Sequence, residues 1–277
     1  MGVSFAVFVI TVKGSTRWPI NLDYLGFGNH EIHSVESLST KFDAAELAGL
    51  HKGRDIYSLT VGRDMSLSEI GCAYGHQLAY ESFLRTTNSW ALILEDDADM
   101  QSPIQSLFTT IQHKADPSVI SLIDRRGGIE YLFRKCPSPL MSLLTPSQAT
   151  SAYLINRNAA AIFLENYNRR GILSPSDWPY PQSRKISFYS LREPIFKHEW
   201  SSLNSLISQE RDLIIRTGFY DPEILRRFTI IGSLQRILKL RHLGLSIKET
   251  FYAEFTLKLL SILALNLKAL QNRIKKF

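Results

Sequence analysis

Short, continuously apolar runs recur along the chain and leave room for helices between them. Runs of this length, bounded by turn residues, predict strands that are buried on both faces. They lie at Val3–Val12, Trp90–Leu94, Ser118–Ile123 and Ser151–Asn156. We expect the first of them to be a central strand of a sheet.

Helical patterns fill most of the intervals between these runs. Ser66 and Glu69 have the spacing of a capping box, in which side chain and backbone cap each other at a helix N-terminus. Helices are therefore expected over residues 40–50, from Ser66 to about Thr86, from Pro103 to about His113, and over Asn158–Tyr167. Strands that alternate with helices predict an α/β protein with a mostly parallel sheet.

Three adjacent acids follow the second apolar run. Glu95, Asp96 and Asp97 come directly after Leu94, so we expect them at the carboxyl end of a strand, where α/β sheets bind ligands. Neighbouring carboxylates repel one another unless a cation holds them, and a divalent metal with open positions also binds substrate phosphates. A solvated turn or a helix cap explains the same acids without a ligand, and the cluster by itself does not decide between the two.

The helix expected after Ser66 carries a second group of informative residues. Gly71 costs a helix interior about 1 kcal/mol relative to alanine, so a packing or ligand reason is expected for it. The free N–H groups at the helix N-terminus suit a phosphate or a carboxylate. The alternative is a capped helix with small residues for close packing and an exposed His76.

Composition sets the class of protein. With 277 residues, 44% of them hydrophobic, the chain has enough apolar material for one large domain, alone or with appendages. Its two cysteines, Cys72 and Cys136, lack metal-ligand spacing and suggest no disulfide framework. We expect no signal peptide, because no basic region precedes Val3–Val12, and no window of about twenty residues is apolar enough to span a bilayer.

Taken together, the motifs resemble glycosyltransferase family 25, which includes bacterial lipooligosaccharide galactosyltransferases and the collagen galactosyltransferases of animals. The resemblance covers roughly residues 3–210 and lies in Leu67–His76, Leu92–Asp97, Val7–Ile10 with Arg17, and Ala152–Ala160 followed by Asp177. The chain departs from the family pattern where Ser68, Gly75, Val12-Lys13 and Ala152 replace the usual Gly, Ser, Asn-Leu and Gly.

The resemblance implies a GT-A-like fold, with a Rossmann-type mixed sheet that binds a nucleotide sugar and is flanked by helices. The implied donor is most often UDP-galactose, and a divalent cation, Mn²⁺ or Mg²⁺, bridges the acid motif and the diphosphate. Asp97 is then the main metal ligand, with Asp96 or Glu95 supporting it and reaching the ribose. The residues implied to contact the donor are Ile10, Thr11, Arg17, Glu69, His76, Glu95, Asp96 and Tyr153. For Arg17, a surface arginine paired with a nearby acid is the alternative.

The family is assigned as inverting, which requires one in-line displacement and a carboxylate that removes the acceptor proton. Asp177 is the candidate base, and Trp178 and Tyr180 in the same Pro-rich loop are suited to stack on a sugar. An aspartate that fixes a turn beside prolines is the alternative. His198 is a candidate third metal ligand or phosphate contact, although most lone histidines are neither.

The C-terminal segment is strongly basic. Residues 225–277 hold eleven lysines and arginines and two acids, a net charge of +9 that leaves −3 for the rest of a chain of net charge +6. A basic helix with apolar faces suits an anionic bilayer, where each cation contributes about 1 kcal/mol. A helix packed on the domain or on a partner is the alternative, and no motif supports nucleic acid. We therefore expect a catalytic domain over 1–222 and a basic helical region over 223–277.

These observations predict a metal-dependent inverting glycosyltransferase that moves a hexose, with galactose the first candidate, to a lipooligosaccharide or related glycolipid or oligosaccharide. The predicted location is the cytoplasm, peripheral to the inner face of the cytoplasmic membrane. One alternative is a metal-dependent phosphoesterase, although the further His and Asp ligands that it needs are not found at spaced motifs. The other is a non-catalytic glycan-binding or scaffold relative, against which the intact Glu95-Asp96-Asp97 argues.

Overall fold

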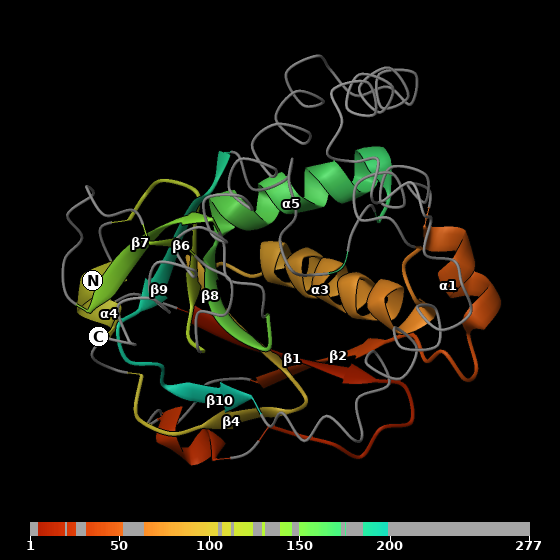
Figure 1. Cartoon of the computed structure of the whole chain (residues 1–277), viewed down its shortest axis with the longest axis horizontal. Helices are drawn as coiled ribbons and strands as arrows, with labels where there is room; N and C mark the ends of the chain where they lie inside the picture. Colours follow the sequence, from red (N-terminus) through yellow and green to blue (C-terminus); the bar gives the residue numbers. More distant parts are fainter. Residues whose placement is uncertain are drawn as a thin grey trace, which may run out of the picture. The chain divides into compact units, whose positions relative to one another are not determined.

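The computed structural model describes residues 5–19, 21–25, 32–51, 64–104, 107–111, 114–123, 129–130, 139–145, 150–172, 175 and 185–198. These residues form an eight-stranded mixed sheet of order β2-β1-β3-β8-β5-β9-β7-β6 and a two-stranded sheet of β10 and β4 (Figure 1). The strands are β1 (Phe5–Val12), β2 (Ile32–Ser37), β3 (Trp90–Glu95), β4 (Ala98–Met100), β5 (Ser118–Ser121), β6 (Ile129–Glu130), β7 (Leu140–Thr145), β8 (Ala152–Asn156), β9 (Ser187–Leu191) and β10 (Phe196–His198). The helices are η1 (Leu22–Leu25, a 3-10 helix), α1 (Ala44–Leu50), α3 (Leu67–Arg85), α4 (Phe108–Ile111) and α5 (Arg157–Arg170).

The large sheet is mixed and flanked by helices, which confirms what the family resemblance implies and corrects the mostly parallel sheet expected from the alternation of strands and helices. β1 pairs in parallel with β2 and β3, and β5 pairs in parallel with β9. The pairs β3–β8, β5–β8, β7–β9 and β6–β7 are antiparallel. β8 lies between β3 and β5 and runs against both. All five of its residues are buried, so its apolar pattern is the same as that of a buried parallel strand and gives no sign of its direction.

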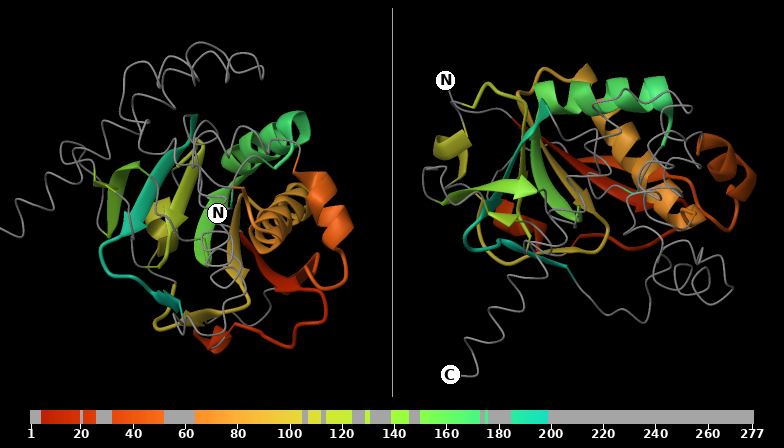
Figure 2. Two further views of the ribbon diagram at one scale, coloured as in Figure 1. Left: turned by 45° about the vertical axis from the view of Figure 1, so that its right-hand side comes forward. Right: turned by 45° about the horizontal axis from the view of Figure 1, so that its top comes forward.

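Both faces of the central strands are covered. Alternate residues of β1, such as Val7 and Val9, join a core cluster with Leu92, Leu94 and residues of β4 and η1. The intervening residues of β1 face α3. α3 and α5 lie side by side against this face of the sheet, where α5 contacts β8 and β5 (Figures 1 and 2). This alternation follows from the two-residue period of a strand. It also aims every second side chain of β3 at α3.

The capping box predicts the start of α3 correctly. The Glu69 backbone N–H donates to Ser66 Oγ at 3.2 Å, and the Ser66 N–H donates to Glu69 Oε2 at 2.8 Å. The helix ends at Arg85, where the N–H of Thr86 donates to the Phe83 carbonyl at 3.0 Å. Gly71 has the packing reason that its position demands, because a Cβ there would lie 3.2 Å from the carbonyl oxygen of Leu38.

Other predicted elements are confirmed with shifted ends. α1 begins at Ala44, not at residue 40, and α5 runs past the expected Tyr167 to Arg170. The helix expected from Pro103 to about His113 is described as α4, Phe108–Ile111; Pro103 and Ile104 are not helical, and its expected end at His113 lies outside the described residues. Proline fits a helix start but does not require one.

Gly75→Ala should destabilise the protein, because the position has no room for a side chain. An added Cβ would lie 2.6 Å from Ile10 Cγ2 and 3.1 Å from Ser37 Cβ. The clash outweighs the roughly 1 kcal/mol that alanine gains in a helix, so we expect a net loss of about 1–2 kcal/mol in the free energy of unfolding. Urea unfolding followed by circular dichroism measures it.

Gly49→Ala is the matched control for this substitution. Gly49 is also helical, and among the described residues no atom lies within 4 Å of an added Cβ. We expect this variant to be as stable as the wild type or more stable by up to about 1 kcal/mol. Equal effects at the two glycines would contradict the close approach of α3 to β1.

The chain divides into two compact units, Met1–Gly53 with Met65–Asp212 and Arg54–Asp64 with Leu213–Phe277. The described residues belong to the first unit, apart from Asp64. The expected boundary at 222/223 and the expected helical tail lie outside the described residues and stay predictions. Within the described part of the chain, no helix is long and apolar enough to cross a membrane.

Candidate active site

The predicted acid site forms where β1 and β3 end. The two strands are parallel, with Ile10 opposite Glu95, so the turns that follow them lie next to each other. Asp96 and Asp97, here called the acid pair, occupy the turn between β3 and β4. Arg17, in the turn after β1, places its Nη2 3.4 Å from Asp97 Oδ2 and 3.8 Å from Asp96 Oδ1.

Ser15 joins the two turns more directly. Its hydroxyl donates to Asp96 Oδ2 at 3.3 Å and accepts a hydrogen bond from the Arg17 backbone N–H at 3.1 Å. Arg17 therefore reaches the acids from a turn that is itself tied to them. Its side chain is 53% exposed, so its two long contacts leave it able to turn toward an anion in solvent.

The electrostatics of the acid pair favour a bound cation. Burial raises the pKa of the Asp96 carboxyl above its ordinary value, and the neighbouring charges of Asp97 and Glu95 raise it further. Arg17 and the Ser15 hydroxyl act in the opposite direction and do not cancel the effect. Because the ionised form is disfavoured here, a divalent cation that neutralises both carboxylates would stabilise the turn.

The strand after the acid pair brings a further candidate ligand near it. β4 pairs antiparallel with β10, and in this register His198 lies opposite Ala98, the residue after Asp97. The backbone of His198 thus lies beside the turn that holds the acid pair, although about a hundred residues separate His198 from Ala98 in the sequence. Its side chain is outside the described residues, and its role as a metal ligand stays a prediction.

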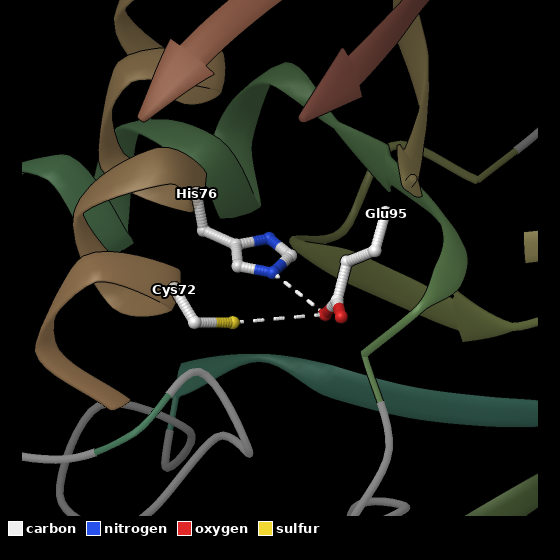
Figure 3. Close-up of side chains that lie close together, drawn as sticks. All are labelled: Cys72, His76 and Glu95. Carbon is white, nitrogen blue, oxygen red and sulfur yellow. Dashed lines mark hydrogen bonds and ion pairs between the residues drawn. The ribbon is translucent and has the colours of Figure 1, made fainter. Parts of the chain in front are cut away.

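Glu95 differs from the acid pair in its partners, since its carboxylate faces α3. Oε1 of Glu95 lies 3.2 Å from His76 Nε2 and accepts a hydrogen bond from the Thr150 hydroxyl at 2.9 Å. The Cys72 thiol approaches the same oxygen at 3.8 Å (Figure 3). The predicted cluster of three acids is therefore split between the acid turn and the interior under α3.

His76 is fully buried, which rules out the alternative of a capped helix with an exposed histidine. Its Nδ1 lies 2.7 Å from the hydroxyl of Tyr153, which lies 2.8 Å from that of Tyr80. Burial raises the pKa of Tyr153 and of Tyr80 well above the ordinary value, so both remain neutral hydroxyls. The result is a chain of polar groups from the helix to the sheet that ends at Glu95.

The remaining predicted donor contacts occupy different places. Ile10 is buried, on the side of β1 that faces Gly75, and Thr11, partly exposed, pairs with Glu36 of β2. Glu69 is buried, and its carboxylate caps α3. Asp177, the predicted base, lies outside the described residues. The structure thus brings Arg17 to the acid pair and gathers His76, Glu95 and Tyr153 in a neighbouring group.

Ser15, Thr150 and Cys72 belong to these groups but were not predicted as site residues. For Cys72 a signal was present: Cys72 and His76 are four residues apart on a helix and so share one face. Spacing between the cysteines alone could not reveal it. Ser15 and Thr150 carry no such signal, because their positions depend on how separate strands align.

Comparisons with known proteins agree with the motif analysis. The sequence model of glycosyltransferase family 25 (LPS biosynthesis protein) matches residues 6–177. No curated protein sequence matches the chain. Among solved structures, a glycosyltransferase involved in the glycosylation of the major capsid of PBCV-1 aligns over 76% of this chain and 99% of its own, with 10% identity and a TM-score of 0.32. The inositol-1-phosphate CTP transferase of T. maritima aligns over 77% and 97%, with 9% identity and a TM-score of 0.32.

Proposed function

The chain belongs to glycosyltransferase family 25, and on this premise we propose that it transfers a hexose from a nucleotide sugar, with UDP-galactose the first candidate, to a lipooligosaccharide or related glycan. The observation that carries the proposal is the convergence of Asp96, Asp97 and Arg17 at the carboxyl ends of β1 and β3. In α/β proteins this edge of the sheet is where ligands bind.

The donor atoms of the acid pair fit a hard divalent cation. Mn²⁺ and Mg²⁺ prefer carboxylate oxygens, and the raised pKa of Asp96 means that its ionised form lacks sufficient compensation from Arg17 alone. Asp97 and Asp96 would hold the ion, with His198 a candidate third ligand. When bound, the cation supplies positive charge to the diphosphate of the donor and of the departing nucleotide.

Arg17 is suited to the diphosphate itself. Its guanidinium is more than half exposed and sits on a turn held by Ser15, so it can leave the acid pair for a phosphate oxygen without disturbing either strand. Arginine binds phosphate through paired N–H donors. We assign it the positioning of the diphosphate beside the acid pair.

Transfer with inversion proceeds in one displacement. The acceptor hydroxyl oxygen forms a bond to the anomeric carbon as the bond from that carbon to the phosphate oxygen breaks, and UDP leaves with the electron pair. The hydroxyl proton passes to a carboxylate, for which Asp177 is our candidate. Asp177 follows α5 in sequence, and α5 starts directly after β8, which pairs with β3.

A divalent-metal requirement tests the proposed function. The purified full-length protein, stripped with EDTA, should release no UDP from UDP-galactose, and added Mn²⁺ should restore release that a lipooligosaccharide acceptor accelerates. Parallel reactions with UDP-glucose and UDP-N-acetylglucosamine identify the donor. If no UDP-sugar is consumed with Mn²⁺ and acceptor present, the proposal is wrong; metal-dependent cleavage of simple phosphoesters at comparable rates would favour a phosphoesterase.

The membrane association proposed for the basic C-terminal segment, residues 225–277, has a test of its own. Replacing Arg273, Lys275 and Lys276 by glutamine removes three charges, each worth about 1 kcal/mol at an anionic surface, so liposome affinity should fall by about a hundredfold. Sedimentation with liposomes containing anionic lipid measures this, and neutral liposomes provide the control. Unchanged binding would show that these cations do not contact the membrane.

A further inference from the structure

Cys72, His76 and Glu95, here called the inner cluster, bring three different metal-binding atoms together (Figure 3). The sulfur of Cys72 lies 3.8 Å from Glu95 Oε1, and His76 Nε2 lies 3.2 Å from the same oxygen. All three donor atoms are within 4.8 Å of one another. The side chains point to a common place between α3 and the end of β3, and the acid pair is not part of it.

These separations suit a tetrahedral zinc ion. Zinc binds sulfur at about 2.3 Å and nitrogen or oxygen at about 2.0–2.1 Å, so two ligands at a tetrahedral angle are roughly 3.3–3.6 Å apart. The observed 3.2 Å and 3.8 Å lie on either side of that range. The third pair, Cys72 and His76, has its donor atoms within 4.8 Å, so the Cys72 side chain would move toward His76 when an ion binds.

The ligand atoms are carried by regular elements. Cys72 and His76 lie one turn apart on the same face of the long helix α3. Glu95 ends β3, and its backbone N–H donates to the Ser151 carbonyl at 2.8 Å. The three side chains are therefore placed before any ion binds, which lowers the cost of ordering them.

Hydrogen bonds from outside the inner cluster orient two of its three side chains, His76 and Glu95. Nδ1 of His76 lies 2.7 Å from the Tyr153 hydroxyl, so the ring presents Nε2 to the cluster. The Thr150 hydroxyl donates to Glu95 Oε1 at 2.9 Å. Metal-bound histidines commonly donate their other N–H to such a partner, and these partners contribute strongly to affinity.

The tyrosine pair accommodates either tautomer of His76. In the tautomer with its proton on Nε2, His76 can donate to Glu95 while Nδ1 accepts from Tyr153. With a metal on Nε2, the proton would reside on Nδ1 and be donated to the Tyr153 oxygen. Nδ1 of the buried His76 thus keeps a hydrogen-bond partner whether or not the ion binds.

We propose that the inner cluster is a Zn²⁺ site, with the Cys72 thiolate, His76 Nε2 and a Glu95 oxygen as ligands. On binding, the thiol proton passes to solvent, and the three ligands each give an electron pair to the ion. His76 is buried whereas Cys72 and Glu95 are partly exposed, so the open fourth position faces solvent and takes a water molecule.

The ligand types separate this site from the acid pair. Thiolate and imidazole select zinc over Mn²⁺ and Mg²⁺, which prefer the all-oxygen acid pair. The proposal does not depend on the transfer reaction. Zinc binding reports on the inner cluster, whereas Mn²⁺-dependent transfer reports on the acid pair. Because Glu95 is joined to Asp96 in the chain, zinc at the inner cluster also fixes the position from which the acid turn starts.

Cobalt provides a visible probe for the zinc site. Titration of the EDTA-stripped full-length protein with Co²⁺ should give a thiolate-to-cobalt charge-transfer band that saturates at one ion per chain. Equimolar Zn²⁺ should abolish the band, and equimolar Mn²⁺ should leave it unchanged. Cys72→Ser should lack the band, and Cys136→Ser, at the only other cysteine, should keep it.

The proposal is overturned if Co²⁺ binds without a charge-transfer band or if Cys72→Ser keeps it. Alkylation of the wild-type chain with iodoacetamide, mapped by mass spectrometry, serves if Cys72→Ser does not fold. Zn²⁺ should then protect Cys72 at least tenfold, and equal rates with and without Zn²⁺ would refute the site. Tyr153→Phe should weaken zinc binding by about 10–100-fold while the band persists at saturation.

Discussion

Asp97→Asn is expected to lower kcat/KM for sugar transfer by about 10²–10³-fold, because the amide cannot give the metal the charge that its binding requires. The carboxylate of Asp97 lies 3.4 Å from Arg17 in the turn where β3 passes into β4. Replacement by asparagine keeps the shape of the side chain and removes only its charge. UDP release at graded UDP-galactose concentrations, each measured over a range of Mn²⁺ concentrations, gives the loss.

Two further measurements distinguish loss of the metal from loss of the fold. The variant should need far more Mn²⁺ for half-maximal activity, whereas its unfolding midpoint without metal should not fall. Asp116→Asn is the matched control, since Asp116 is exposed and Ser118 and Asn156 donate to its backbone carbonyl, which the substitution leaves intact. Activity of Asp97→Asn within twofold of the control would remove Asp97 from the metal site.

Local signals in the sequence predicted the elements that carry the site. Ser66 and Glu69 predicted the start of α3, because a capping box acts within four residues and needs no tertiary contact. The apolar run before Glu95 predicted β3, because the length and apolar character of a buried strand are also local features of the sequence. The position of the acid pair directly after a strand could be predicted in the same way, and its role as a metal site stays a proposal.

What the sequence could not supply is the alignment of distant strands. Tyr153 meets His76 because β8 runs antiparallel beside β3 with Tyr153 opposite Ile93, on the face that α3 covers. A buried strand has no period that reveals its direction, so the apolar pattern could not predict this pairing, and only the family resemblance implied a mixed sheet. The separation of Glu95 from Asp96 follows from the strand alternation at its last residue.

The structure also changes the meaning of the histidine in the helix motif. The family resemblance implies that His76 contacts the donor. The buried ring instead touches Glu95 and Tyr153, so its effect on the acid pair passes through the end of β3. Its proposed role in donor binding is therefore that of a positioning residue.

Asp96→Asn is expected to stabilise the metal-free protein and to weaken Mn²⁺-dependent transfer. Burial raises the pKa of this carboxyl above 3.8, so the folded state holds its proton more tightly than the unfolded state does. Stability from this group is thus fully present below pH 3.8 and is lost as the pH rises through the raised pKa. At neutral pH the ionised Asp96 opposes folding, and the asparagine does not.

Urea unfolding without divalent ions separates this prediction from a simple structural role. The advantage of Asp96→Asn over the wild type should grow as the pH rises from 4 toward neutrality, and Mn²⁺ should reduce it by stabilising only the wild type. The affinity for Mn²⁺ should fall by about 10–100-fold or more, since losses of outer-shell partners alone cost that much. A variant that is less stable than the wild type at pH 7 would mean that Ser15 and Arg17 already compensate the charge, and the acid pair would then not require a cation.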